Sequence, residues 1–455
     1  MAKLVSLAVA GFVWFGSAQA LADTILSDLD ALFAQNSEKR AEIIEKLRLR
    51  GTDDILPALV HYKRYLRMPP AFDQLMVDLA DLSGAEDVPE TWHEWMLWLE
   101  ANPHIEPFDG FDRFKSKIFR RIDPDFDHFI YPGVARDIRL EEIVWGGVSK
   151  DGIPALTNPD LIGADNAHFM TDDELVFGVE INGDVRAYPL RIMDWHEMFN
   201  DVIGGVPVSL AYCTLCGSGI LFQTSVEGRA APLVFGSSGL LYRSNKLMYD
   251  NATHSLWNQF TGKPVVGPLV GSDIALKTRP VVITSWGKWT AKHPETKVLS
   301  LRTGHRRDYT PGAPYGRYFD SPDLMFPAMV RRDELQAKDY VFALRSSGAE
   351  KAWPITAFEG GRVINDRAGA LTLVLIGDAA NRTVRAFRAG GQTFQRGDTS
   401  SSLVDQSGFE WTVTESALIS EDGRQLTRLP GHIAYWFAWA GYFGEAGEFG
   451  SAKPH

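Results

Sequence analysis

Cysteine is the scarcest reactive residue in this 455-residue chain: only Cys213 and Cys216 are present, so the chain can carry at most one internal disulfide. A basic excess is also missing. The net charge of −12 argues against non-specific binding to nucleic acid or to anionic lipid, which both require a basic face. After the first 20 residues no apolar run reaches about eighteen residues, so we expect no stable membrane insertion once the leader is cleaved.

Several common cofactor and nucleophile motifs are absent as well. The sequence has no Walker loop, no G-x-G-x-x-G and no G-x-S-x-G, and the run 236–239, GSSG, is one residue short of a nucleophile elbow. No nucleotide cofactor is therefore indicated.

The N-terminus is typical of a secretory signal. Lys3 supplies the positive start, residues 4–15 form an apolar run, and Ala18-Gln19-Ala20 is a small-x-small cleavage site. We therefore expect residues 1–20 to be a signal peptide and the mature protein to be periplasmic or secreted. The alternative is an uncleaved membrane anchor.

The overall composition, 45% hydrophobic and 23% charged, is that of a globular protein with a sizeable core. Residues 24–121 show helical periodicity, and 122–164 are a linker or entry segment. Short β-type runs separated by Gly, Asn and Asp turns then begin, including a hairpin around Asn182-Gly183 and a strand over 206–212 that ends at Cys213. Between them, 194–202 is expected to be a short helix with Asp194 as its N-cap. The fold class is α+β.

An internal repeat organises the β-rich part. VFGVEINGDVRAYPL (176–190) aligns with VFALRSSGAEKAWPI (341–355) at a constant shift of 165, and the same shift pairs Asn200-Asp201 with Asn365-Asp366. We predict a first repeat over 165–310, an inter-repeat loop over 311–334 and a second repeat over 335–445. The alternative is chance similarity of two β-rich stretches.

The repeat also sorts residues by role. Positions that are alike in both copies, such as Asn200, are expected to serve the fold. Positions that are polar only in the first copy are better functional candidates. In the alignment His196 corresponds to Gly361 and Cys213 to Asp378, and the run 243–254 has no counterpart. We expect the first repeat to be the functional copy and the second to be a scaffold.

The C-x-x-C pair allows three readings. A strand, a tight turn and a following Gly217 resemble a metal-binding knuckle. A redox or catalytic thiol is a second possibility, although no helix is expected to begin at Cys213 and lower its pKa. A structural disulfide is the third, and it would stabilise little because its loop is so short.

A metal site would need more than two thiolates. Its predicted ligands are Cys213 and Cys216 with His196, completed by His254, Asp250 or Met248, a donor set that suits copper or zinc. Candidate catalytic residues are Glu197 and Asp250, which could move a proton, and Arg243, which could bind an anionic or carbonyl group of a small molecule. The competing interpretation is that these residues have ordinary structural roles in turns or on the surface. The loop 302–327, with His305 and several tyrosines, is either a lid or a linker.

Five longer motifs carry a family resemblance: WGGVSKDGIPAL, RAYPLRIMDWHEMFND, AYCTLCGSGILF, SNKLMYDNATHSLWNQFTG and YWFAWAGYF. Across roughly residues 130–445 the chain resembles the bacterial domain-of-unknown-function 3179 family. The resemblance implies no assigned reaction. It places these residues in signature positions: His196, Cys213, Cys216, Met248, Tyr249, Asp250 and Trp257.

Three hypotheses follow from the sequence. The first is an exported copper or zinc protein, possibly a metalloenzyme, that uses the two cysteines and His196. The second is a metal-free thiol/disulfide redox enzyme. The third is a non-catalytic binding or scaffold module in which the cysteines only staple a turn.

Overall fold

The computed structural model describes residues 20–33, 36–84, 89–346, 348–399, 401–444 and 447–450. All but the last residue of the predicted signal peptide therefore lies outside the described residues. The chain divides into two compact units, Met1–Trp145 with Val266–Pro268 and Gly146–Val265 with Leu269–His455. No described helix has the length and apolar character needed to cross a membrane.

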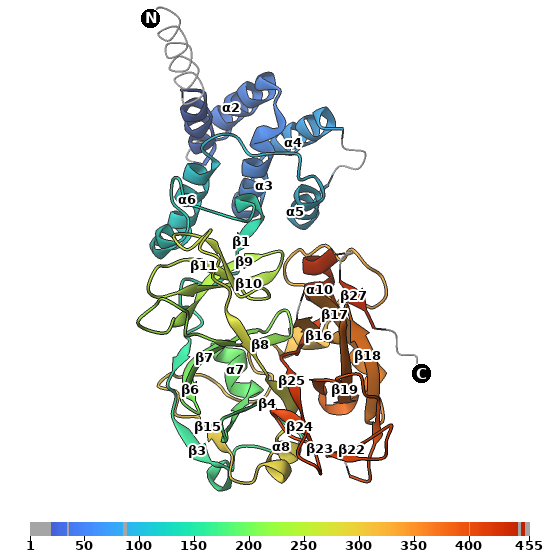
Figure 1. Cartoon of the computed structure of the whole chain (residues 1–455). Coiled ribbons are helices and arrows are strands. Elements are labelled where there is room, and N and C mark those ends of the chain that lie inside the picture. The colour runs from blue at the N-terminus through green and yellow to red at the C-terminus, as the bar shows by residue number, and fades with distance from the viewer. Residues whose placement is uncertain are drawn as a thin grey trace, which may run out of the picture. The chain divides into compact units, whose positions relative to one another are not determined.

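The first unit is helical, as predicted, and its helices have sequence-encoded ends (Figure 1). Asn36 caps one helix, which Gly51 ends in the left-handed conformation, and Thr91 forms a capping box with Glu94 at the start of another. The elements are α2 (Ser37–Arg50), η1 (Asp53–Ile55), α3 (Leu56–Tyr65), α4 (Pro70–Leu82), α5 (Trp92–Ala101), α6 (Phe111–Ile122), η2 (Pro124–His128), η3 (Leu140–Glu142) and β1 (Ile143–Trp145).

The second unit is built from short strands and contains both predicted repeats. The first repeat and its entry segment comprise β2 (Leu156–Thr157), β3 (Leu161–Gly163), η4 (Ala164–Asn166), β4 (Leu175–Ile181), β5 (Asp184–Pro189), α7 (Leu190–His196), β6 (Met198–Ile203), β7 (Val206–Cys213), β8 (Ser218–Gln223), β9 (Phe235–Tyr242), β10 (Asn245–Asp250), β11 (Leu256–Asn258), β12 (Lys263–Val266), β13 (Lys277–Arg279), β14 (Val282–Ser285), α8 (Trp286–Lys292) and β15 (Lys297–Leu299). The helix α9 (Gly316–Asp320) lies in the inter-repeat loop.

The second repeat, orange to red in Figure 1, has a matching series of strands. It comprises β16 (Tyr340–Ser346), β17 (Ala349–Pro354), η5 (Ile355–Phe358), β18 (Arg362–Ala368), β19 (Leu371–Asp378), η6 (Ala379–Asn381), β20 (Thr383–Arg388), β21 (Phe394–Arg396), β22 (Ser402–Asp405), β23 (Glu410–Val413), β24 (Ala417–Ser420), β25 (Gln425–Leu429), β26 (His432–Tyr435), α10 (Trp436–Phe443) and β27 (Glu448–Phe449).

Strand pairing is the same in the two halves. The order β14-β4-β5-β15 in the first repeat corresponds to β26-β16-β17-β27 in the second, and in each the last strand joins in parallel while the others pair antiparallel. The order β13-β8-β7-β6 likewise corresponds to β25-β20-β19-β18. The two sequence segments thus fold with one topology.

Side-chain contacts recur at the paired positions. The Asn200 side chain donates to the Phe235 carbonyl at 2.9 Å and accepts from the Phe235 N–H at 2.8 Å. Asn365 makes the same two hydrogen bonds with Phe394, both at 2.8 Å. Asp250 accepts from the Trp257 indole in the first repeat, and in the second Asp405 accepts from an indole as well. These shared residues hold the fold, as a duplicated unit predicts.

One local prediction is wrong. Residues 194–202 do not form a helix: α7 ends at His196, and Met198–Ile203 is the strand β6, paired antiparallel with β7. Asp194 lies in the last turn of α7 and is not its N-cap. The segment forms a strand because β6 pairs with β7 along its whole length and packs Phe199 and Ile203 into the core. That core contains residues of both repeats, including Phe177, Tyr212 and Trp353.

Candidate functional site

The C-x-x-C turn joins β7 to β8 and is buried. Cys213 and Cys216 form a disulfide, and the two residues are 3% and 0% exposed. Gly217 follows with φ +58°, and a Cβ there would meet the rings of Tyr340 and Tyr435 at 3.0 and 3.1 Å. The glycine is needed both for its left-handed backbone and for this close approach.

Long-range hydrogen bonds from three residues fix the turn in place. The Gln259 amide donates to the Ala211 carbonyl and the Ser218 carbonyl, both at 2.9 Å. The Tyr318 hydroxyl donates to the Leu215 carbonyl at 2.7 Å, and the Tyr435 amide donates to the Cys216 carbonyl at 2.8 Å. The inter-repeat loop and the second repeat therefore both hold the cysteine turn.

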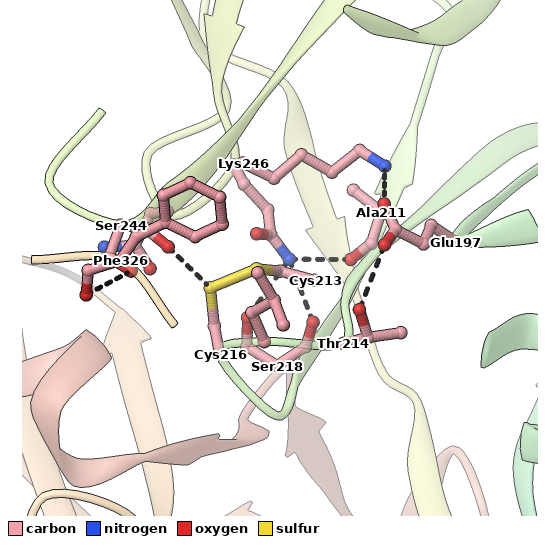
Figure 2. The surroundings of a disulfide bond; sticks show 12 residues. Glu197, Ala211, Cys213, Thr214, Cys216, Ser218, Ser244, Lys246 and Phe326 are labelled. Carbon is pink, nitrogen blue, oxygen red and sulfur yellow. Dashed lines mark hydrogen bonds and ion pairs between the residues drawn. A yellow bond between two sulfur atoms is a disulfide. The ribbon is translucent and has the colours of Figure 1, made fainter. Parts of the chain in front are cut away.

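A buried ion pair lies against the turn. Lys246 Nζ is 2.6 Å from Glu197 Oε2, and the other carboxylate oxygen accepts from the Thr214 hydroxyl at 3.0 Å (Figure 2). The same oxygen also accepts from the Tyr315 hydroxyl at 3.2 Å. Glu197 is 8% exposed and Lys246 is 4% exposed. Thr214 is itself part of the C-x-x-C sequence, so this network contacts the disulfide turn directly.

Strained backbone gathers around the same site. Glu197, Arg243 and Ser244 have φ of 54°, 47° and 59°, a region that non-glycine residues seldom occupy. The last two form the β9–β10 turn, and this turn brings the Ser244 carbonyl to 3.4 Å from Cys216 Sγ, on the opposite side of the disulfide from Lys246 in Figure 2. Such strain persists where surrounding structure enforces it, and it clusters at functional sites.

Asp194 adds a proton-binding group to this site. Burial raises its pKa to about 7, against the opposing influence of a hydrogen bond from Tyr212 and the positive charge of Arg382, while the nearby Glu197 carboxylate raises it further. Its Oδ1 atom is buried with no hydrogen-bond partner among the described residues, as is Oε1 of Gln259. A carboxyl with this pKa can gain or lose a proton near neutral pH.

His196 is placed differently from the predicted ligand position. Its Nδ1 is 2.8 Å from the Pro154 carbonyl, which can only accept, so Nδ1 carries the proton. Its Nε2 accepts from the Tyr309 hydroxyl at 2.6 Å, and burial lowers the pKa of the imidazole to about 4. Neutral His196 thus anchors the inter-repeat loop through Tyr309.

The remaining predicted residues are spread over the β9–β11 region. Met248 is fully buried on β10, where it pairs with Trp257. Asp250 accepts from Ala252, Thr253 and the Trp257 indole, which is the fold contact that the second repeat also makes. His254 lies in the turn after β10 with φ 56°.

The predicted metal ligands are not gathered into one site. No three His, Cys, Asp or Glu side chains within the described ranges are placed to hold one metal ion. The two sulfurs are instead bonded to each other. Arg243 lines a cavity of about 510 Å³ with Arg331 and the end of α10.

Several residues of the site were missed by sequence reasoning or weighed lightly. Thr214 and Gln259 gave no distinct signal, and Asp194 was assigned to a helix cap. The available clue is the spacing of Asp194 and Glu197, three residues apart within a largely apolar stretch, because two acids in a segment that is otherwise expected to be buried need a reason. Tyr315 and Tyr318 lie in the inter-repeat loop, whose sequence contains several tyrosines but does not indicate a role for any one of them.

Comparison with known proteins gives a family and no activity. Residues 150–446 match the family model described as protein of unknown function (DUF3179), and the chain belongs to this family. No curated protein matches the chain. No solved structure matches it either.

Proposed function

We propose that this protein is an exported thiol–disulfide oxidoreductase in which Cys213 and Cys216 are the redox group. The observation that carries the proposal is the buried Glu197–Lys246 pair bound to Thr214 inside the C-x-x-C turn. A staple across two intervening residues stabilises little, and burying an ion pair is costly. Charged groups of this kind are typical of sites that must move protons or stabilise charge.

A thiolate of a dithiol substrate attacks Cys213, the less buried of the two cysteines, and forms a mixed disulfide while Cys216 leaves as a thiolate. The second substrate thiol then attacks the mixed disulfide and releases Cys213. The substrate becomes a disulfide, and the protein gains two electrons and two protons.

The polar groups beside the turn suit the proton steps. Asp194, with its pKa near 7, can deliver or accept a proton at neutral pH. The Lys246 ammonium supplies positive charge on the same side of the turn as Thr214. A reduced Cys216 thiol would find an acceptor at once, because the Ser244 carbonyl is 3.4 Å from its sulfur.

Access to the disulfide is through the inter-repeat loop. Tyr315 and Tyr318 of this loop donate to Glu197 and to the Leu215 carbonyl, and the Phe326 carbonyl is 3.5 Å from the Ser244 hydroxyl. The loop thus supports the lid interpretation. Substrate entry requires these contacts to open, and their restoration would keep water from the mixed disulfide.

Both the expected export of the protein and the metal-binding hypothesis concern Cys213 and Cys216. Export, as the N-terminal sequence predicts, would place the disulfide where it is stable. Copper or zinc binding would require the reduced pair and a further ligand brought close to it. Elemental analysis of oxidised and reduced protein therefore accompanies the functional test.

A stoichiometric electron balance tests the proposal. Oxidised protein is mixed under native conditions with limiting reduced dithiothreitol, and thiols are alkylated and located by mass spectrometry. We expect one oxidised dithiothreitol for each protein whose Cys213 and Cys216 become labelled, and none from Cys216→Ser, which has no disulfide to be reduced. Labelling that occurs only in denaturant, or stoichiometric copper or zinc on the isolated protein, would overturn the proposal.

A further inference from the structure

A group of positively charged side chains lines a cavity between α8 of the first repeat and several strands of the second. This cavity, about 420 Å³, lies between α8 and the strands β18, β19, β20 and β22. Its charged lining residues, which we call the cationic pocket, are Lys288, Lys292, Arg362, Arg385, Arg396 and Asp378. Figure 1 shows α8 at the same end of the unit as β22 and β23.

The pocket has more cations than its carboxylates can neutralise. Five cationic side chains face one carboxylate in the lining, a formal 5 − 1 = +4. Lys288 pairs with Asp378. Beneath the lining, the buried Glu415 carboxylate binds Lys292 at 3.0 Å and Arg385 at 2.6 Å, and it also binds Arg428.

Two arginines are left without an acidic partner. Among the residues that the structure describes, Arg396 donates only to the Gly361 carbonyl, at 3.3 Å. For Arg362, no side-chain hydrogen bond or ion pair joins it to any part of the chain that the structure describes. In a protein of net charge −12, two unpaired guanidinium groups at one cavity indicate an anionic occupant.

The rest of the lining points to an organic anion. Val363, Ile376, Leu403 and Val413 form apolar wall, and Thr383 and Ser402 add hydroxyl groups. A cavity with an apolar wall and a few polar groups at one side recognises molecules that have both parts. Guanidinium groups suit planar, two-oxygen anions such as carboxylates.

The location of the pocket follows from the duplication. The shift of 165 places Asp378 at the position of Cys213 (378 − 213 = 165) and Arg362 at that of Glu197 (362 − 197 = 165). The pocket therefore occupies the place that corresponds to the disulfide site of the first repeat. In the first repeat this position is filled by Glu197 and its buried partners Lys246 and Thr214. In the second repeat Arg362 replaces the acid, and a cavity is present.

We infer that the second repeat binds a small organic carboxylate, with its carboxylate group at Arg362 and Arg396 and its apolar part against Val363 and Leu403. This site is separate from the disulfide and does not depend on the redox proposal. It gives the second repeat a ligand of its own in place of a purely supporting role.

Calorimetric titration of the full-length protein with sodium benzoate tests the inference. Benzoate carries one carboxylate and a flat apolar ring, and we expect a dissociation constant on the order of 0.1 mM. Arg362→Gln and Arg396→Gln should each weaken binding about tenfold, because each removes a charge-assisted contact. Arg367→Gln is the matched control: it is an exposed arginine of the same strand, β18, outside the pocket lining, and it should leave binding unchanged.

Two further titrations separate the contribution of the ligand's charge from that of its ring. Benzyl alcohol has the ring without the charge, and inorganic phosphate has charge without the ring, so both should bind at least about tenfold more weakly than benzoate. Equal binding of benzoate to wild type and to both pocket variants would overturn the inference, as would phosphate binding as tightly as benzoate. Because Arg362 and Arg396 are exposed, unchanged unfolding midpoints are expected and show that the variants fold.

Discussion

Removing Lys246 should strongly destabilise the β-rich unit. Its ammonium group is 2.6 Å from Glu197, and the two side chains are 5% and 10% exposed. Lys246→Met leaves the Glu197 carboxylate buried without a cation, which costs about 3–5 kcal/mol. The hydrogen bonds from Thr214 and Tyr315 remain, so we expect the lower end, about 3 kcal/mol.

The double variant separates pairing from packing. Glu197→Gln alone should also cost about 3 kcal/mol, because the lysine is then the unpaired buried charge. In Glu197→Gln/Lys246→Met both charges are gone and the amide oxygen can still accept from Thr214, so the cost should fall to about 1–2 kcal/mol. The free energy of the pair is thus largely an interaction term.

Urea unfolding followed by tryptophan fluorescence measures these costs, with each of the two compact units given its own transition. Lys263→Met, on an exposed position of β12, is the control and should change stability by no more than about 0.5 kcal/mol. Single-variant costs that simply add in the double variant would refute the reasoning, since they would show that Lys246 and Glu197 do not stabilise each other.

Three further predictions concern the same unit. Burial raises the folded pKa of Asp194 to about 7 from its ordinary 3.8, so this group favours the native state below about pH 4 and that contribution is lost as pH rises towards 7. Asp194→Asn should therefore gain stability over wild type between pH 4 and 7, on the order of 4 kcal/mol, in urea titrations at each pH; a pH-independent difference would contradict this. Gly217→Ala should lower the unfolding midpoint more than Gly228→Ala, because both have positive φ but only the first would meet neighbouring rings. Asn200→Ala and Asn365→Ala should each cost about 2–3 kcal/mol by equilibrium unfolding, because each leaves two backbone groups unsatisfied; a loss at only one of them would argue against equivalent roles in the two repeats.

Much of the fold could be predicted because its signals are local. The helical first unit, the Asn182-Gly183 hairpin and the strand that ends at Cys213 follow from caps, turn residues and alternation. The helix expected over 194–202 failed because its second half pairs with β7, a contact formed by distant chain. Local propensity does not report such pairing.

The site was only partly predictable from the sequence. Cys213, Cys216 and Glu197 were identified, but their partners come from distant segments: Lys246 from β10, Gln259 from the end of β11, and Tyr315 from the inter-repeat loop. His196 was expected at the sulfurs because the second repeat lacks it. Its ring instead binds Pro154 and Tyr309, and one sequence contains no signal for that orientation.

The reduction potential of Cys213–Cys216 tests the central claim most directly. Native protein is equilibrated in graded glutathione and dithiothreitol buffers, quenched by alkylation, and the labelled fraction is measured by mass spectrometry. The account predicts reversible reduction without unfolding and a midpoint above about −300 mV, the range of exchangeable pairs. A pair that stays oxidised well below that potential until denaturant is added would contradict the account and identify the disulfide as a staple.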